Sequence, residues 1–453
     1  MGNGEWEEDI SFPHSPLPTP HSPLPIPHSP LPFFTIHMAP QSSDQAHQSV
    51  DHLFRHRAGQ MVATLTRIFG IERLDLVEDA AQDALVRALK LWPFQGVPDN
   101  PSAWLIQVAK NRMLDQLRRD SRLTETTDEI EIPIAGESDA VFASEIRDDQ
   151  LRMIFTCCHP LIPQDGQIAL TLKTVGGFSV SEIARAFLAQ ESGVTKTLVR
   201  AKQRLREFEI ELEMPQPDKL PARLESVLKV VYLMFNEGYS ALEGEELVRT
   251  DLCHEAIRLC ELLAGHPVTG APKVHALSAL LLFQGARSNA RCDAAGELLL
   301  LSEQDRSLWD QAMIKRALYR LRKSASGDEV SDYHLEAEIA SCHALAESFE
   351  ATDWPRVLDC YEELLDRKPS PVVALNRIVA LAEVDGVEAG LAALNKLAED
   401  RTLRNYYPFY AARGELLREA GRKGEAIDAY QKALSLTSSE PIRRFLMKRV
   451  AAL

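Results

Sequence analysis

The chain is short of positive charge. Its 50 lysines and arginines face 66 aspartates and glutamates, which gives a formal net charge of −16. This balance excludes a uniformly basic surface for nucleic acid, but it leaves room for local basic segments, because the distribution of charge matters more than its sum. Two such segments are present, at residues 104–122 and 173–208, and a strongly acidic stretch at 124–170 separates them.

The chain also lacks a long apolar run and a targeting segment. Its longest apolar run, ALSALLLF at 276–283, is far shorter than the roughly 20 residues that cross a bilayer. The first residues contain neither a basic segment nor an unbroken apolar core, so no secretory signal is expected. Cysteine is scarce and odd in number, seven in all, which is typical of reduced thiols rather than a disulfide framework. The sequence predicts a cytoplasmic protein without membrane contact.

Motifs for chemistry are missing as well. The sequence contains no GxxxxGK[ST] motif, which leaves an ATP-driven regulator unsupported. CCHP at 157–160 offers three potential metal ligands, but adjacent cysteines rarely share one zinc ion and no second ligand pair accompanies them. We therefore expect neither a metal nor any other cofactor.

FNEGYS at 235–240 is the remaining candidate for catalysis. It offers Asn236, Glu237 and Tyr239, but an enzyme site also requires a partner base, a nucleophile or a metal. A helix that ends at Gly238 in a left-handed cap explains the stretch more simply. We expect no catalytic residues and a protein that is not an enzyme, with an enzyme centred on FNEGYS as a rival hypothesis.

The sequence is rich in helical periodicity, which predicts an all-α fold of several domains. Residues 1–49 precede it and repeat PHSPLP three times. Such a proline density predicts disorder, with Met38 as a natural alternative start and a Pro-rich docking ligand as the functional alternative. Apolar residues then recur at helical spacing over 50–122, where Asp99-Asn100-Pro101-Ser102 marks a helix start.

The rest of the chain divides into four further segments. Residues 123–144 are acidic and lose the periodicity, which predicts a linker. Periodicity returns at 145–212 and continues in a helical extension at 218–325. At 333–453 the helices form pairs, and RVLDCYEELL echoes EAIDAYQKAL. Six residues match the spacing of the tetratricopeptide (TPR) signature; they are Tyr410, Gly414, Leu417, Ala426, Tyr430 and Ala433. This match predicts a TPR-like array rather than an ordinary helical hairpin.

The second basic segment contains an amphipathic helix, SGVTKTLVRAKQRLR at 192–206. Ser179 and Glu182 form a capping box on the preceding helix, so two helices joined by a tight turn, the second one basic, make a helix-turn-helix candidate. The inward face is predicted to hold Val194, Leu198, Ala201 and Leu205. The residues left outside are Ser192, Thr195, Lys196, Arg200, Gln203 and Arg206. Docking on DNA is favoured over a merely solvated face, with the first residues near base edges and Lys202, Arg204 and Arg206 near phosphates.

The first basic segment contains PSAWLIQVAKNRMLDQLRR at 101–119. Helical spacing predicts that it buries Trp104, Leu105, Val108, Leu114 and Leu117. It would then present Gln107, Lys110, Asn111, Arg118 and Arg119 to solvent. Two basic modules tied by an acidic linker imply two contacts on one nucleic acid.

Residues 50–212 resemble a bacterial RNA polymerase sigma factor of the extracytoplasmic-function (ECF) class. DLVEDAAQDALVRALKLW (75–92) is similar to regions 2.1–2.2, which dock on the coiled coil of the polymerase β′ subunit. AWLIQVAKNRMLDQLRR (103–119) is similar to regions 2.3–2.4, which melt and read the −10 element. FSVSEIARAFLAQESGVTKTLVRAKQRLR (178–206) is similar to region 4, which reads the −35 element.

The resemblance implies roles for individual residues and for partners. The partners are core RNA polymerase, through the β′ coiled coil and the β flap, and promoter DNA. The polymerase-binding residues it implies are Asp79, Gln82, Asp83 and Arg87. The −10 residues are Lys110, Asn111, Arg118 and Arg119. The −35 residues are Ser192, Thr195, Lys196, Arg200, Lys202, Gln203 and Arg206. Gly193 in the first turn departs from the usual recognition helix, which affects promoter preference.

The C-terminal part of the sequence narrows the resemblance to one subgroup of ECF sigma factors. VVYLMFNEGYSA (230–241) and the TPR-like segment are similar to an ECF subgroup with a long helical extension. The resemblance implies that this extension supports or regulates sigma activity, with Asn236, Glu237 and Tyr239 as a candidate contact to region 4 and a protein partner on the array. A stand-alone helix-turn-helix regulator with a TPR sensor is the alternative, but it leaves 75–119 unexplained.

Overall fold

The computed structural model describes residues 57–121, 139–187, 189–239, 250–293 and 297–453. These residues form helices and loops, apart from one isolated bridge between Cys292 and Leu298. The predicted all-α fold is therefore confirmed. The predictions made for residues 1–49, for Met38 and for the first part of the linker lie outside the described residues.

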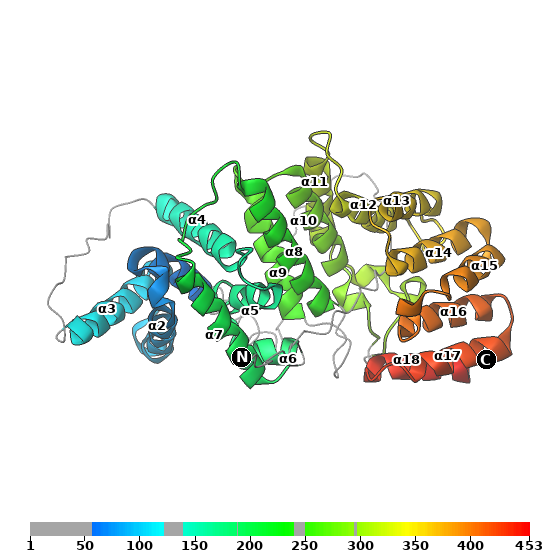
Figure 1. The fold of residues 1–453 in the computed structure, drawn as a ribbon, viewed down its shortest axis with the longest axis horizontal. Coiled ribbons are helices and arrows are strands. Elements are labelled where there is room, and N and C mark those ends of the chain that lie inside the picture. The colour runs from blue at the N-terminus through cyan, green and yellow to red at the C-terminus, as the bar shows by residue number, and fades with distance from the viewer. Residues whose placement is uncertain (1–56, 122–138, 188, 240–249, 294–296) are drawn as a thin grey trace, which may run out of the picture. The chain divides into compact units, whose positions relative to one another are not determined.

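The chain divides into two compact units, and the division falls between Val230 and Val231. The first unit contains a helical segment at 57–69 and the start of α8 (Leu220–Tyr239). Between them lie η1 (Ile71–Arg73), α2 (Leu74–Gln95), α3 (Pro101–Ser121), α4 (Asp139–Cys157), α5 (Gln164–Thr174), α6 (Val180–Ala186) and α7 (Glu191–Glu207), drawn from blue to green in Figure 1.

The N-terminal half of the first unit is built on the pair α2 and α3. Small and apolar residues at helical spacing face inward from α2, because they allow a close approach of the neighbouring helices; they are Leu74, Val77, Ala80, Ala81, Ala84 and Ala88. α3 begins at Pro101, as predicted, and the Oδ1 atom of Asn100 accepts the N–H of Ala103 at 3.0 Å. Asn100, rather than its neighbours, is therefore the capping residue.

The C-terminal half of the first unit surrounds α5, which is buried along most of its length and contacts α4, α6 and α7. α4 begins at Asp139, so the end of the predicted linker is helical instead of irregular. A buried carboxylate joins the two halves: Asp149 of α4 binds Arg67 and Arg152, each at 2.8 Å. The two halves thus form one unit within the chain.

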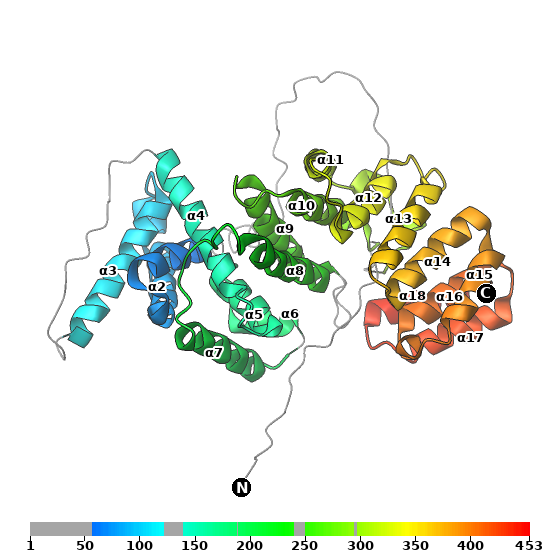
Figure 2. The same ribbon diagram turned by 45° about the horizontal axis from the view of Figure 1, so that its top comes forward.

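The second unit is a succession of helices from the end of α8 to the C-terminus, drawn from green to red in Figure 2. Its α-helices are α9 (Thr250–Gly265), α10 (Pro272–Gly285), α11 (Gln311–Ser324), α12 (Asp332–Leu345), α13 (Trp354–Arg367), α14 (Pro371–Asp385), α15 (Val387–Leu397), α16 (Tyr407–Glu419), α17 (Lys423–Leu434) and α18 (Glu440–Ala451). Its short 3-10 turns are η2 (Ser288–Ala290), η3 (Leu301–Glu303), η4 (Arg306–Leu308) and η5 (Arg401–Leu403). None of the described helices combines the length and the apolar character that a bilayer crossing requires.

The internal repeat is visible in the burial of α13 and α17. The two helices bury the same positions of the repeated pattern, with Tyr361 and Tyr430 as the largest side chains. α17 packs on α16, where the ring of Tyr430 lies over Gly414. A Cβ atom on Gly414 would stand 2.5 Å from that ring, which explains in physical terms why the small residue and the aromatic residue occur together.

Candidate nucleic-acid interface

α7 has the two faces that its sequence predicts. Val194, Leu198, Ala201 and Leu205 are its buried residues, which confirms the predicted inward face. The predicted outer residues are all exposed; they are Ser192, Thr195, Lys196, Arg200, Gln203 and Arg206. The predicted capping box on α6 is also present, because Ser179 N donates to Glu182 at 2.7 Å and Glu182 N donates to the Ser179 hydroxyl at 3.2 Å.

Lys202 and Arg206 of α7 are engaged within the first unit. The Nζ atom of Lys202 lies 2.7 Å from Asp75 and 2.9 Å from Glu78 of α2, and Arg206 also binds Asp75. Only 11% of the Lys202 side chain is exposed. Burial alone would lower the pKa of Lys202, but the carboxylates of Glu78 and Asp75 outweigh burial and raise it. The predicted phosphate-contacting end of α7 is therefore held against α2.

α3 presents part of the predicted −10 surface. Asn111, Arg118 and Arg119 are exposed, and Gln107 Nε2 donates to the Asn111 Oδ1 atom at 2.9 Å. Lys110 is only 8% exposed, and burial lowers its pKa. The prediction that Lys110 faces solvent is wrong, because the buried face of α3 is rotated from the predicted one. Its buried members are Leu105, Ile106, Ala109, Lys110 and Met113.

The ring of Trp104 lies beside that of Trp92, with 5.5 Å between their centroids. This contact joins the start of α3 to the end of α2. Trp104, Val108, Leu114 and Leu117 are half-buried rather than buried. The predicted apolar face of α3 therefore lies at the edge of the core.

The outer face of α2 combines charged and apolar residues. Asp79, Gln82, Asp83 and Arg87 are exposed, and Asp83 binds Arg112 of α3 at 2.7 Å. Large apolar side chains are exposed on the same helix: Val86 by 49%, Leu89 by 57% and Phe94 by 89%. Exposed apolar residues bordered by polar ones are typical of protein interaction sites. The sequence did not predict that these apolar side chains are exposed, because helical periodicity does not show whether a neighbouring element covers an apolar face.

CCHP lies at the end of α4, and its cysteines are buried. The Sγ atom of Cys157 is 3.1 Å from the Thr174 hydroxyl, and burial raises the pKa of both thiols. Burial, with a smaller effect of Arg223, lowers the pKa of His159 to about 4. Across the residues that the structure describes, no group of three or more His, Cys, Asp or Glu side chains is placed to hold a metal ion.

FNEGYS differs from its prediction. α8 continues through Gly238 to Tyr239, so the predicted left-handed cap at Gly238 is wrong. Packing explains the extra residue, because the Tyr239 ring stacks on Phe235 and the guanidinium of Arg291 covers it at 4.0 Å. Asn236 and Glu237 are half-buried on the same turn. The contact of these residues with region 4 stays a prediction.

Comparison with known proteins identifies two segments and one relative. The Sigma-70 region 2 family matches residues 53–123, which contain α2 and α3. A family of unknown function (DUF6596) matches residues 223–325, close to the predicted helical extension. An uncharacterized protein of Rhizobium meliloti (strain 1021) is 42% identical over 385 residues, which cover 84% of this chain and 90% of that protein. The chain belongs to the family of this rhizobial protein, and its sigma-70 region 2 segment supports a sigma-factor-like protein.

Proposed function

We propose that the protein is an ECF-type sigma factor, which binds core RNA polymerase and directs it to promoters with −10 and −35 elements. The match of residues 53–123 to sigma-70 region 2 is the observation that carries this proposal. The same unit contains the basic helix α7, and this combination favours a two-site reader of DNA over a stand-alone regulator.

The outer face of α2 is the proposed polymerase-binding surface. It offers acidic Asp79 and Asp83 together with the exposed apolar residues Val86 and Leu89. Apolar contacts supply affinity in protein interfaces, and charges around them supply orientation and specificity. Such a face suits a partner helix with basic and apolar side chains, which agrees with docking on the β′ coiled coil.

Two surfaces are proposed to contact promoter DNA. Asn111, Arg118 and Arg119 at the exposed side of α3 would contact the −10 element. Ser192, Thr195, Lys196 and Arg200 at the start of α7 would contact the −35 element, as a second helix of a helix-turn-helix does. All seven side chains are exposed, so no unfolding is needed for either contact.

The second unit is proposed to support or regulate this activity. It includes the segment that matches the family of unknown function and the repeated helices that we interpret as a TPR-like array. Stacked helical pairs of this kind form extended binding surfaces. A partner protein on the array is part of the same proposal.

The first test is binding to core polymerase in the absence of DNA. We expect the full chain to be retained by immobilised core polymerase, and the double variant Val86→Asp/Leu89→Asp to lose at least about tenfold in affinity, because charges replace buried apolar contacts. Leu308→Asp is the matched control, because Leu308 is 52% exposed and lies outside α2. Promoter binding by the chain alone, without any complex with core polymerase, would instead favour the stand-alone regulator.

A further inference from the structure

A cavity of about 560 Å³ lies within the second unit, on the repeated helices that we interpret as a TPR-like array. Along residues 371–451 its walls come from α14, α16 and α18, which alternate in the chain with α15 and α17. Stacked helical repeats form extended concave surfaces that bind partners. The cavity therefore belongs to a surface that corresponding helices of successive pairs build together.

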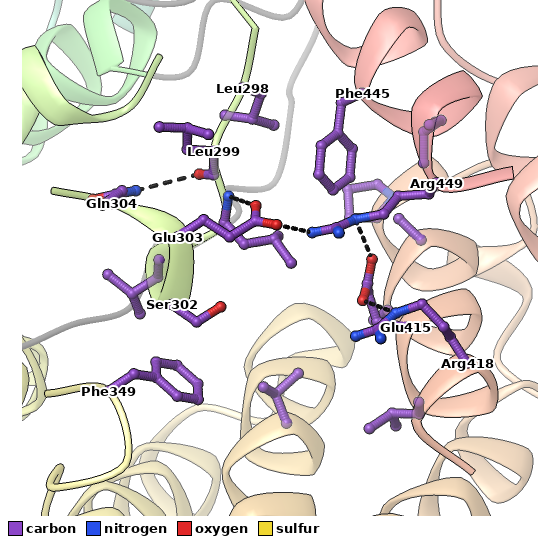
Figure 3. Close-up of a pocket in the computed structure, with 18 of the residues that line it drawn as sticks. Leu298, Leu299, Ser302, Glu303, Gln304, Phe349, Glu415, Arg418, Phe445 and Arg449 are labelled. Carbon is purple, nitrogen blue, oxygen red and sulfur yellow. Dashed lines mark hydrogen bonds and ion pairs between the residues drawn. The ribbon is translucent and has the colours of Figure 1, made fainter. Parts of the chain in front are cut away.

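Residues 297–304 of the same unit, which we call the leucine segment, cover part of this surface. Their sequence, ELLLLSEQ, places four leucines between two glutamates. All four leucines line the cavity, and Leu298 and Leu300 pack against the apolar core of the helices from α14 to α18. Leu301 is only 9% exposed. Figure 3 shows the leucine segment near Phe445 and the helices of the array.

Both glutamates of the leucine segment bind cations of α18. Glu297 lies 2.8 Å from Lys448, and Glu303 lies 2.8 Å from Arg449. Arg449 also binds Glu415 of α16 at 2.9 Å, so its guanidinium joins the leucine segment to two helices of the array (Figure 3). Apolar contacts in the middle and acid–base pairs at the ends are the usual arrangement of a bound peptide.

The charge of α18 favours acidic ligands. Its sequence, EPIRRFLMKRVA, contains one carboxylate and four cations, a net charge of 4 − 1 = +3 in a chain whose net charge is −16. The cations are Arg443, Arg444, Lys448 and Arg449. Complementary charge steers partners and suppresses wrong ones. The surface therefore selects apolar segments that carry carboxylates.

The leucine segment is attached to the array by side chains. Its backbone bonds stay within the extension, where Leu299 N donates to the Arg291 carbonyl at 2.9 Å and Leu300 N donates to the Glu303 carboxylate at 2.9 Å. The side chain of Lys448 is 67% exposed, and exposed ion pairs contribute little net stability. A competing ligand can displace such an attachment, and the cavity leaves room for a larger one.

We propose that α14, α16 and α18 form a peptide-binding groove, which the leucine segment occupies in the free chain as an internal ligand. The partner presents an apolar segment between two acidic residues and displaces the leucine segment. This is the partner that the proposed function places on the array, so the inference rests on that part of the proposed function and adds the chemistry of the partner.

Fluorescence anisotropy with the full chain tests the internal ligand. The probe is the peptide ELLLLSEQD, residues 297–305 of this chain, labelled at its N-terminus and amidated. Glu297→Gln/Glu303→Gln should bind it at least about fivefold more tightly than wild type, because the internal competitor has lost both ion pairs. Neither position is buried, and Gln retains an acceptor for Leu300 N, so this variant should fold. Absence of binding to both chains, or equal affinity of the two, would overturn the proposal.

A neutral peptide tests the chemistry of the partner. In the Glu297→Gln/Glu303→Gln chain, QLLLLSQQD should bind at least about fivefold more weakly than ELLLLSEQD, since it cannot form ion pairs with Lys448 and Arg449. Equal affinities of the two peptides would show that apolar contacts alone select the ligand, and an acidic partner would then be excluded.

Charge reversal locates the peptide on α18. Lys448→Glu, added to the Glu297→Gln/Glu303→Gln chain, should weaken binding of ELLLLSEQD, and the peptide KLLLLSEQD should recover the lost affinity. Lys396→Glu, an exposed position of α15 outside the cavity, is the matched control and should leave both affinities unchanged. If KLLLLSEQD recovered nothing, the groove would be wrongly placed. Binding is measured without polymerase or DNA, so this result is separate from the outcome for the proposed sigma activity.

Discussion

Glu336 of α12 is a carboxyl group whose titration should affect the stability of the second unit. The Tyr232 hydroxyl donates to it at 2.8 Å, and burial raises the pKa of Glu336 from 4.5 to about 7 despite this hydrogen bond. The folded state thus holds the proton more tightly than the unfolded state. The stabilisation is complete below the unfolded pKa and is lost as the pH rises through the folded pKa.

We therefore expect the thermal midpoint of the second unit to fall as the pH rises from about 4.5 to about 7. Glu336→Gln keeps an acceptor for Tyr232 but cannot titrate, so it should flatten this pH dependence. Glu347→Gln, an exposed neighbour on the same part of the chain, is the control and should leave it unchanged. Identical pH profiles for wild type and Glu336→Gln would contradict the role of Glu336.

Gly414 allows the ring of Tyr430 to approach α16. Gly414→Ala would place a Cβ atom 2.5 Å from a ring carbon, so either the ring or the helix must move. We expect a loss of about 1–3 kcal/mol in the free energy of unfolding, the usual cost of overpacking, measured by denaturant unfolding. Gly424→Ala in α17 meets no atom within 4 Å and should be neutral or stabilising. Equal effects of the two variants would show that Gly414 is not a packing requirement.

At the scale of elements, the carboxylates of α2 would compete with DNA for the cations of α7 if α7 binds DNA as proposed. Lys202 and Arg206 bind Asp75 and Glu78, and neither cation is available to a phosphate while these pairs persist. Asp75→Asn/Glu78→Gln should release both. We expect the free protein to bind duplex DNA more tightly. The slope of log K against log salt concentration should also become steeper, by the amount that up to about two additional phosphate contacts contribute.

Fluorescence anisotropy over a salt series measures this change. Glu72→Gln is the control, because Glu72 pairs with its neighbour Arg73 rather than with α7. An unchanged salt slope in Asp75→Asn/Glu78→Gln would mean that Lys202 and Arg206 do not reach phosphates even when they are released.

The local sequence pattern was sufficient to predict some features of the helices but not others. The inward face of α7 and the capping box of α6 depend on residues three or four positions apart, so the sequence predicts them correctly. Lys110 was misplaced because α3 packs on neighbours that its own periodicity does not reveal. Gly238 was misplaced because a ring contact between Tyr239 and Arg291 extends α8.

Long-range contacts account for what the sequence could not predict in the candidate sites. Lys202 meets Asp75 across 127 positions of the chain, and no motif links them. The cavity of the second unit is assembled from residues between Arg287 and Arg449. Charge complementarity of this kind appears only when the fold brings distant helices together.

At the scale of the whole molecule, the division of the chain within α8 predicts separable activities. Residues 1–230 include the match to sigma-70 region 2 and α7, whereas residues 231–453 include most of the extension. A chain that ends at residue 230, where the two units divide, should retain binding to core polymerase but lose run-off transcription. Run-off transcription on genomic fragments measures activity, and a pull-down with core polymerase measures binding. The full chain is the control in both experiments. Full transcription by the shortened chain would show that the extension is dispensable.

The engagement of Lys202 with α2 also decides which substitutions on α7 are informative. Replacing Lys202 removes one partner of two carboxylates, so a loss of promoter use would mix altered folding with altered DNA contact. Arg200 is exposed on the same helix, and α2 carboxylates are bound by Lys202 and Arg206 instead. A promoter mutation combined with Arg200→Ala therefore reports on base contact directly, whereas the same experiment at Lys202 requires a double-mutant cycle with Asp75 before it can be interpreted.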